Sequence, residues 1–184
     1  MIDFGSGRIV STGMLAARTA GRFAMVAALL LASAWLVLSP ARAGPIHDAA
    51  KAGDAAEVER LIAAGPDVDE KDIAQKTALH WAAEMGRLDV AQLLVAKGAN
   101  VNAKDITNWT PLHLAVYDEH EAVVELLIAK GADVNALDKD GIAPLDRPAF
   151  KGYAGIVKML QVAGAKCGTN YHQSQLCRQA LGLE

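Results

Sequence analysis

Clusters of basic residues and catalytic motifs are both missing from this chain. Its 18 Lys and Arg are outnumbered by 21 Asp and Glu, which gives a formal net charge of −3. Affinity for nucleic acid depends on phosphate contacts from clustered basic side chains, so we expect no nucleic-acid partner. The sequence also pairs no nucleophile with a base and has no glycine-rich phosphate loop or paired carboxylates. These absences indicate a protein that is not an enzyme and that needs no cofactor or metal.

The chain also lacks an apolar run of the length that spans a membrane. Its longest apolar stretch, residues 23–38, has 16 residues, whereas a membrane helix needs about 20. Three arginines precede this stretch, and the small-x-small sequence at 41–43 follows it. This pattern predicts a secretory signal peptide over residues 1–43, cleaved after Ala43.

Two alternatives remain open for this leader. The apolar stretch could be retained as a membrane anchor, and translation could start at Met14 rather than at Met1. The leader holds four of the basic residues and one acidic residue, so its removal would leave a formal net charge of −6. We expect the mature protein to be periplasmic or secreted, in a Gram-negative envelope, and to have no membrane contact after cleavage.

A four-residue block that returns every 33 residues is the strongest positive signal in the sequence. It reads TALH at 77–80, TPLH at 110–113 and APLD at 143–146, and GPIH at 44–47 is in the same register. Self-similarity at this period is typical of stacked repeat proteins. These blocks resemble those of ankyrin repeats, with four copies, of which the outer two are degraded.

Each copy has the pattern of two short helices. In the second copy an alanine-rich run at 81–86 is followed by Val90, Leu93 and Leu94, which have the spacing of one helical face. Gly98 ends this second helix, because glycine takes the left-handed conformation at little cost. The resemblance implies an all-α ankyrin-repeat solenoid of helix-turn-helix repeats joined by β-turn loops. We place the four repeats and the C-terminal capping tail at about 44–71, 72–104, 105–137, 138–168 and 169–184.

The outer copies depart from the common pattern in different ways. Glu57 and Arg60 bring charge to the second helix of the first copy, so its outer side can face water. In the fourth copy Asp146 replaces the recurring histidine. Pro148 falls within the expected first helix, where a proline costs about 3 kcal/mol. We therefore expect that helix to start late or to bend.

The sequence has only two cysteines, Cys167 and Cys177, and both lie close to the C-terminus. An even number of cysteines in an exported protein favours a disulfide, which would pin the tail against the last repeat. A redox switch, or a metal site formed with His172, is the alternative. Helical spacing predicts a small covering helix in the tail, with a face formed by Leu176, Ala180 and Leu181.

Three histidines, His47, His80 and His113, share the 33-residue spacing. This regularity favours a structural role over a catalytic or metal cluster, and the matching histidine of ankyrin repeats holds the turn by hydrogen-bonding neighbouring backbone. His120 falls outside the series and is predicted to be a solvated surface residue. Trp81 takes the position that Leu114 has in the next copy, so we predict that it belongs to the core.

The resemblance further implies that a partner protein binds the concave side, which turn tips and first-helix ends line. Trp and Tyr are frequent anchors of protein interfaces, and apolar turn tips are unusual on a purely solvated surface. In the alternative interpretation Trp109 folds onto the next repeat and Ile106 is an ordinary exposed residue. The predicted binding residues are Ile73, Lys76, Met85, Ile106, Trp109, Tyr117, Asp118, Ile142, Phe150 and Lys151.

Together these features predict a non-catalytic, monomeric module that recognises another protein in the periplasm. It would serve as an accessory or protective factor for another envelope protein. Two alternatives come from other classes: a secreted effector that acts on a host protein, and a tail with redox or metal chemistry of its own.

Overall fold

The structure is a computed structural model that describes residues 44–65 and 67–183. The described residues form stacked helix pairs and no β-strand, so the fold is the all-α solenoid that the sequence predicts. The predicted signal peptide lies outside the described residues. None of the described helices has the length and apolar character needed to cross a bilayer.

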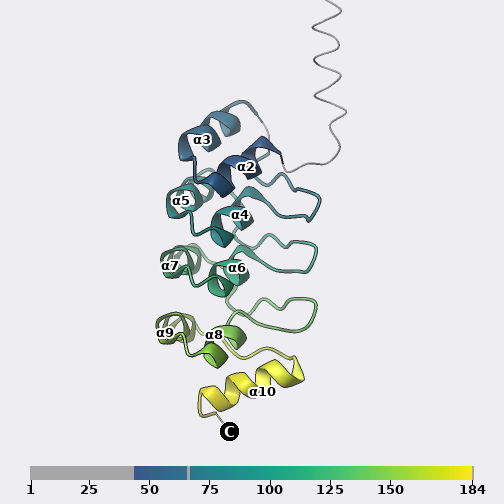
Figure 1. The fold of residues 1–184 in the computed structure, drawn as a ribbon, viewed down its shortest axis with the longest axis vertical. Helices are drawn as coiled ribbons and strands as arrows, with labels where there is room; N and C mark the ends of the chain where they lie inside the picture. The colour runs from purple at the N-terminus through teal and green to yellow at the C-terminus, as the bar shows by residue number, and fades with distance from the viewer. Residues whose placement is uncertain (1–43, 66, 184) are drawn as a thin grey trace, which may run out of the picture. The chain divides into compact units, whose positions relative to one another are not determined.

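Two helices per repeat and one terminal helix make up this part of the chain. Their bounds are α2 Pro45–Ala52, α3 Ala55–Ala63, α4 Ala78–Glu84, α5 Leu88–Ala96, α6 Pro111–Tyr117, α7 Glu121–Ala129, α8 Asp146–Lys151, α9 Ala154–Val162 and α10 Tyr171–Ala180. Figure 1 shows the first helices of the repeats stacked in one layer and the second helices in another. The turn loops project from the first-helix layer, and α10 lies across the end of the stack beside α8 (Figure 1).

The recurring block forms the start of each first helix. Thr77 and Thr110 are N-caps in extended conformation, and the histidine three residues later completes a capping box with each. Pro111 occupies the first helical position of α6, where its missing N–H would have had no helical partner. The block therefore sets the same starting point in each central repeat.

Burial between neighbouring repeats follows the same 33-residue spacing. The first-helix residues Ile46, Leu79, Leu112 and Leu145 are at most 2% exposed, and the second-helix residues Leu94, Leu127 and Leu160 are fully buried. Burying such a side chain contributes about 1.5–3 kcal/mol each. A single repeat has nothing to cover these groups, so stability comes from stacking.

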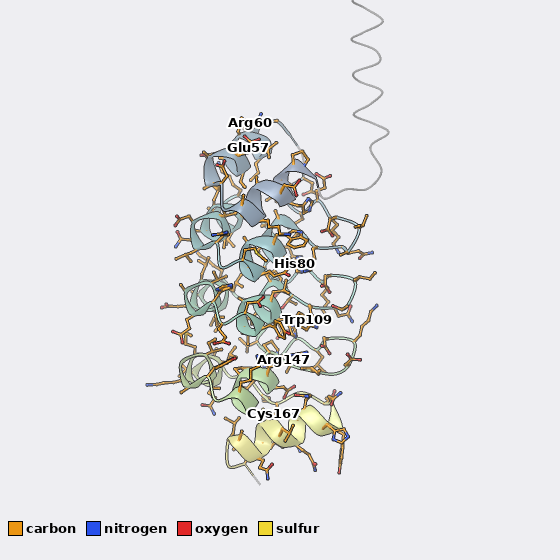
Figure 2. The ribbon with its side chains drawn as sticks, viewed as in Figure 1. Glu57, Arg60, His80, Trp109, Arg147 and Cys167 are labelled. Atoms are coloured by element: carbon orange, nitrogen blue, oxygen red, sulfur yellow. A yellow bond between two sulfur atoms is a disulfide. The ribbon has the colours of Figure 1, made fainter. Side chains whose placement is uncertain are left out.

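The N-terminal end of the stack is polar on its outer side, as the sequence predicts. Glu57 stands where Val90 and Val123 are buried in later repeats, and it pairs with Arg60 at 2.6 Å (Figure 2). Leu61 is only half-buried, because no preceding repeat covers it. An exposed ion pair of this kind adds little stability, but it lets the first repeat end the stack in water.

Helix α8 of the fourth repeat starts late, as the sequence predicts. It begins at Asp146, two residues after the position that corresponds to Pro111. Pro148 is consequently the third residue of the helix, where a backbone N–H would have no partner within the helix. The late start thus removes most of the penalty that proline carries in a helix interior.

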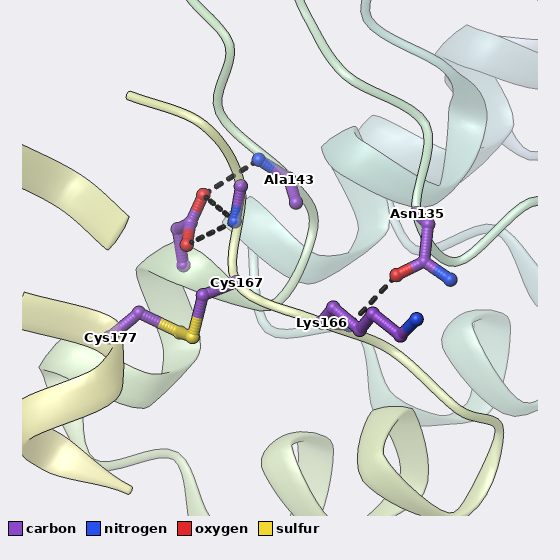
Figure 3. Close-up of a disulfide and its surroundings, with 7 residues drawn as sticks. Asn135, Ala143, Lys166, Cys167 and Cys177 are labelled. Carbon is purple, nitrogen blue, oxygen red and sulfur yellow. Dashed lines mark hydrogen bonds between the residues drawn. A yellow bond between two sulfur atoms is a disulfide. The ribbon is translucent and has the colours of Figure 1, made fainter. Parts of the chain in front are cut away.

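The C-terminal helix α10 covers the exposed side of the fourth repeat and is joined to it by a disulfide between Cys167 and Cys177 (Figure 3). Its inner face agrees with the predicted one only in part. Leu181 packs against the core and Leu176 is half-buried, but the buried residues are Ser174 and Cys177, and Ala180 is exposed. The bond to Cys167 fixes the rotation of the helix, and this rotation turns Ala180 outward.

We predict that replacing Leu94 or Leu127 with Ala lowers the free energy of unfolding by about 2–5 kcal/mol. Both side chains are fully buried between repeats, so each change leaves a cavity. Urea unfolding followed by circular dichroism measures the loss. Glu57→Ala, on the exposed end of the stack, is the control and should leave the midpoint nearly unchanged. A similar midpoint for all three variants would contradict the stacking pattern.

Candidate functional site

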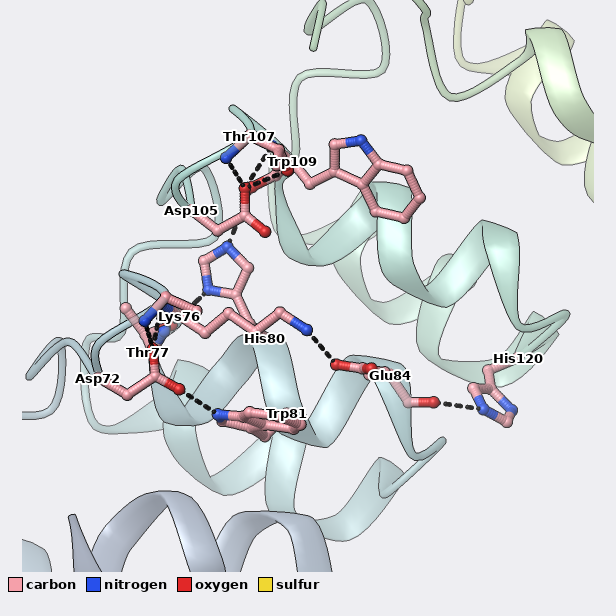
Figure 4. Close-up of polar contacts among 11 residues, drawn as sticks. Asp72, Lys76, Thr77, His80, Trp81, Glu84, Asp105, Thr107, Trp109 and His120 are labelled. Atoms are coloured by element: carbon pink, nitrogen blue, oxygen red, sulfur yellow. Dashed lines mark hydrogen bonds and ion pairs between the residues drawn. The ribbon is translucent and has the colours of Figure 1, made fainter. Parts of the chain in front are cut away.

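Each turn tip is closed around one aspartate side chain. Asp105 accepts hydrogen bonds from the backbone N–H groups of Thr107 and Trp109 at 2.7 and 2.9 Å, and from the Thr107 hydroxyl (Figure 4). Asp72 and Asp138 make the equivalent backbone bonds in the neighbouring repeats. Each aspartate fixes the backbone of the residues that follow it in its own turn, the turn tip. The side chains at the tip can therefore differ from repeat to repeat.

Successive turn tips are also bonded to one another. The N–H of Ile106 donates to the carbonyl of Ala74 at 3.0 Å, and that of Lys139 donates to Thr107 at 3.1 Å. The tips of repeats two to four therefore form a continuous ledge beside the first helices.

The recurring histidines link each repeat to the next. His80 Nδ1 accepts from the Thr77 N–H at 3.0 Å, so the proton of the neutral ring lies on Nε2, which donates to the carbonyl of Trp109 at 3.1 Å (Figure 4). His47 and His113 make the corresponding bonds to Glu70 and Ile142. The three histidines thus make the structural contacts that the 33-residue spacing predicts.

Burial favours the neutral form of these rings. It lowers the pKa of His80 to about 4, against a smaller raising effect of the hydrogen bond to Trp109. Burial likewise lowers the pKa of His113. A protonated ring would place an N–H against the Thr77 N–H, so the inter-repeat bond requires neutral histidine.

A groove of about 680 Å³ lies between the ledge and the first helices. Among the predicted binding residues it gathers Lys76, Ile106, Trp109, Tyr117 and Asp118. Ile106 and Tyr117 are 53% and 41% exposed, which is high for large apolar groups. The groove therefore combines exposed apolar surface with charged side chains in one lining.

Trp109 is only half-buried, and it contacts both its own repeat and the fourth. Its ring lies 5.4 Å from the Tyr117 ring of the third repeat, and its indole N–H donates to Asp138 of the fourth repeat at 3.0 Å. The bond to Asp138 agrees with the alternative interpretation, in which Trp109 folds onto the next repeat. Trp109 hence supports the stack as well as lining the groove, which makes Trp109→Ala an unsuitable probe of binding alone.

The remaining predicted binding residues lie outside the groove lining. Ile73 is 69% exposed at a turn tip, and Met85 is the half-buried C-cap of α4. Ile142 accepts the His113 hydrogen bond and lines a separate small hollow, so its role includes the turn. Lys151 lies beside the groove with its ammonium 5.5 Å from the Tyr117 ring centre. Phe150 belongs to α8, and its side chain is outside what the structure describes.

Sequence reasoning did not place Asp105, Leu114, Asp138 or Arg147 in the groove, although all of them line it. The aspartates could have been found, because Asp72, Asp105 and Asp138 recur every 33 residues. Arg147 could have been found as a cation at the repeat position of Leu114. The repeat pattern does not show which side chains Arg147 contacts.

The prediction that Trp81 belongs to the core is confirmed only in part, because Trp81 packs against the core without being enclosed by it. Its ring is half-buried, its N–H donates to Asp72 at 3.0 Å, and the ammonium groups of Lys51 and Lys76 lie 4.7 and 4.5 Å from its centre. Leu114, at the same repeat position, is buried but touches the groove. This position faces the turn tips, so a large ring there stays partly in water.

The prediction that His120 is a solvated surface residue is wrong. Its ring is half-buried and hydrogen-bonds the carbonyl of Glu84 in the preceding repeat at 3.0 Å (Figure 4). Arg87, 33 residues earlier, reaches the carbonyl of Lys51 in the same way. The position that Arg87 and His120 share thus links neighbouring repeats. The sequence does not reveal this common role, because the two residues are of different types.

At the C-terminal end Asp146 replaces the recurring histidine. Its carboxylate accepts from the Ala143 N–H, as His80 accepts from the Thr77 N–H. Its bond to the next segment has the opposite polarity, because it accepts from the Gly168 N–H where histidine donates to a carbonyl. Its oxygen and the two disulfide sulfurs lie within 4.8 Å of one another. His172 does not belong to this group; it is exposed and packs against the Tyr171 ring.

Comparison with protein-family models assigns these repeats. A model of ankyrin repeats in many copies matches residues 46–95 and 79–128, and a model of three ankyrin repeats matches residues 104–171. This chain belongs to the ankyrin-repeat family. The matches cover well over half of the sequence and agree with the helix pairs of the structure. A comparison with curated proteins finds no match.

Ankyrin repeats are protein–protein interaction modules, so this chain has protein partners. In the ankyrin stack the side chains that vary between repeats are those of the turn tips and first-helix ends. These are the elements that form the groove.

Stability should fall as the pH drops from about 6.5 to 4, because the unfolded chain then binds protons that buried His80 excludes. The lowering of the His80 pKa from 6.5 to about 4 corresponds to a loss of about 3 kcal/mol in the free energy of unfolding once the pH has fallen below 4. Urea unfolding at several pH values measures the slope. In His80→Gln the slope should be shallower.

His172→Gln is the matched control, because His172 is exposed on α10. Its slope should equal that of the unchanged protein. An equal slope for His80→Gln would show that His80 does not exclude its proton in the folded chain.

Proposed function

We propose that this ankyrin-repeat protein is a non-catalytic periplasmic module that binds one partner protein in the groove between its turn tips and first helices. In this role it acts as an accessory or protective factor for another envelope protein. The observation that carries the proposal is the exposure of Ile106 and Tyr117 within one concave surface.

The physical basis is the cost of leaving such groups in water. Large apolar side chains that gather in a concavity lined by charged residues gain free energy when a partner covers them. The ledge of bonded turn tips holds the groove in shape before binding, which limits the entropy lost on association.

The groove prediction concerns Ile106 and Tyr117. The double variant Ile106→Ala with Tyr117→Ala should lose partner capture from periplasmic extract while keeping its thermal midpoint, because neither side chain belongs to the buried core. Immobilised mature chain, with mass spectrometry of the bound proteins, measures the effect.

Val162→Ala with Tyr171→Ala provides the matched control, since these apolar residues are 82% and 71% exposed and lie outside the groove lining. This control should capture the same partner as the unchanged chain. Equal capture by both double variants would remove the groove from the proposed function.

Export follows from the leader pattern of residues 1–43 and is the second part of the proposal. Expression of the full chain in a Gram-negative cell should yield a periplasmic protein whose mass corresponds to a start at Gly44 and which has no free thiol. Intact-mass analysis of cell fractions with thiol labelling measures this.

The other outcomes of the fractionation each support a different alternative. A processed protein in the medium would favour the secreted effector. An unprocessed protein in the membrane fraction would favour the retained anchor. Two free thiols with bound metal would favour a chemically active tail.

A further inference from the structure

Arg147 lines the groove, and its guanidinium lies close to two aromatic rings that are neighbours of each other. The guanidinium carbon is 5.3 Å from the Trp109 ring centre and 4.8 Å from that of Tyr117. The side chain extends from α8 and is half-buried (Figure 2). Arginine stacks on aromatic faces more favourably than lysine does, because its cation is planar and weakly hydrated.

Stacking of this kind leaves the edge of the guanidinium available. Arginine carries five N–H donors in a fixed fork, and stacking uses none of them. The Arg147 side chain makes no hydrogen bond or ion pair to any residue in 44–65 or 67–183. Its charge and its donors are therefore open toward the groove.

Three of the acidic residues that line the groove are already engaged. Asp138 accepts from Asp140, Ile142 and the Trp109 indole, and Asp105 accepts from its own turn. Glu84 is paired with Lys76. The carboxylates of Asp118 and Asp140 also line the groove, but neither is within ion-pair distance of Arg147. No carboxylate of residues 44–65 or 67–183 therefore pairs with Arg147.

Two lysines of the fourth repeat accompany Arg147. Lys139 lines the groove, and Lys151, one turn after Arg147 on α8, is exposed with its ammonium near the Tyr117 ring. Because Asp138 and Asp140 line the same part of the groove, Arg147 differs from its surroundings by lacking an ion-pair partner and not by a positive field. Ile106 and Leu114 supply apolar surface in the same groove.

From this arrangement we propose that Arg147 is the specificity-determining residue of the groove and binds the carboxylate of an Asp or Glu side chain on the partner protein, with an apolar partner residue beside it. A carboxylate matches the two parallel N–H donors of a guanidinium fork, and the neighbouring rings hold that fork in place. The proposal rests on the groove being the binding surface of the proposed function.

The test uses a displayed library of random peptides as its probe, selected on the mature chain. The enriched peptides should share an acidic residue next to an apolar one. A synthetic peptide from this set, amidated at its C-terminus to exclude the terminal carboxylate, is then compared with its Glu→Gln or Asp→Asn counterpart by isothermal calorimetry.

Arg147→Gln should weaken binding of the acidic peptide by about tenfold or more, the scale of a hydrogen bond to a charged group. It should leave binding of the amide peptide nearly unchanged. Arg147→Lys should give an intermediate loss, because lysine retains the charge but lacks the planar fork. The peptide substitution is measured on unchanged protein, so the result does not depend on the folding of a variant.

The outcomes separate this proposal from the one on which it rests. Peptides that lose binding to the Ile106 and Tyr117 double variant, but bind equally as acid and amide, would overturn the role of Arg147 and leave the groove intact. Selected peptides that bind the double variant normally, or a selection that enriches none, would overturn both proposals. Both proposals would be established by peptides that lose binding to the double variant and whose carboxylate contributes to binding only when Arg147 is present.

Discussion

A buried hydrogen bond from histidine to the next repeat is the interaction on which this stack depends. His80 satisfies its own N-cap with Nδ1 and reaches the turn of the following repeat with Nε2. A buried polar group without its partner would cost free energy, so the bond fixes how neighbouring repeats meet as well as adding to their attraction. The leucines of adjacent repeats are then fully buried at that spacing.

The groove is a consequence of the same constraint. Asp72, Asp105 and Asp138 close the turn tips, and backbone hydrogen bonds join successive tips, so the tips keep their shape without help from the Ile106 side chain. Ile106 and Tyr117 are likewise outside the buried core, so they can be exposed without weakening the stack. Trp109 is different, since its indole bonds to Asp138 and joins the third repeat to the fourth. Binding and stability are therefore separable at some groove positions and coupled at others.

The two ends of the stack lack a neighbouring repeat, and each end accommodates its uncovered surface in a different way. At the first repeat, charges replace the apolar groups that a preceding repeat would have covered. At the fourth, Asp146 accepts two backbone N–H groups and α10 packs over α8. A stack that ended without either device would leave apolar surface or buried polar groups open to water.

The sequence by itself determined the repeats, their helix pairs and the late start of α8, because periodic burial and proline chemistry act locally. It also indicated the histidine role, since equal spacing implies equal surroundings. Tertiary structure decided what depends on how the helices pack: the half-buried position of Trp81, the bond of His120 to Glu84, the rotation of α10, and the placing of Arg147 beside Trp109 and Tyr117. Several of those contacts join residues of different repeats, and the geometry of all of them is set only when the helices pack.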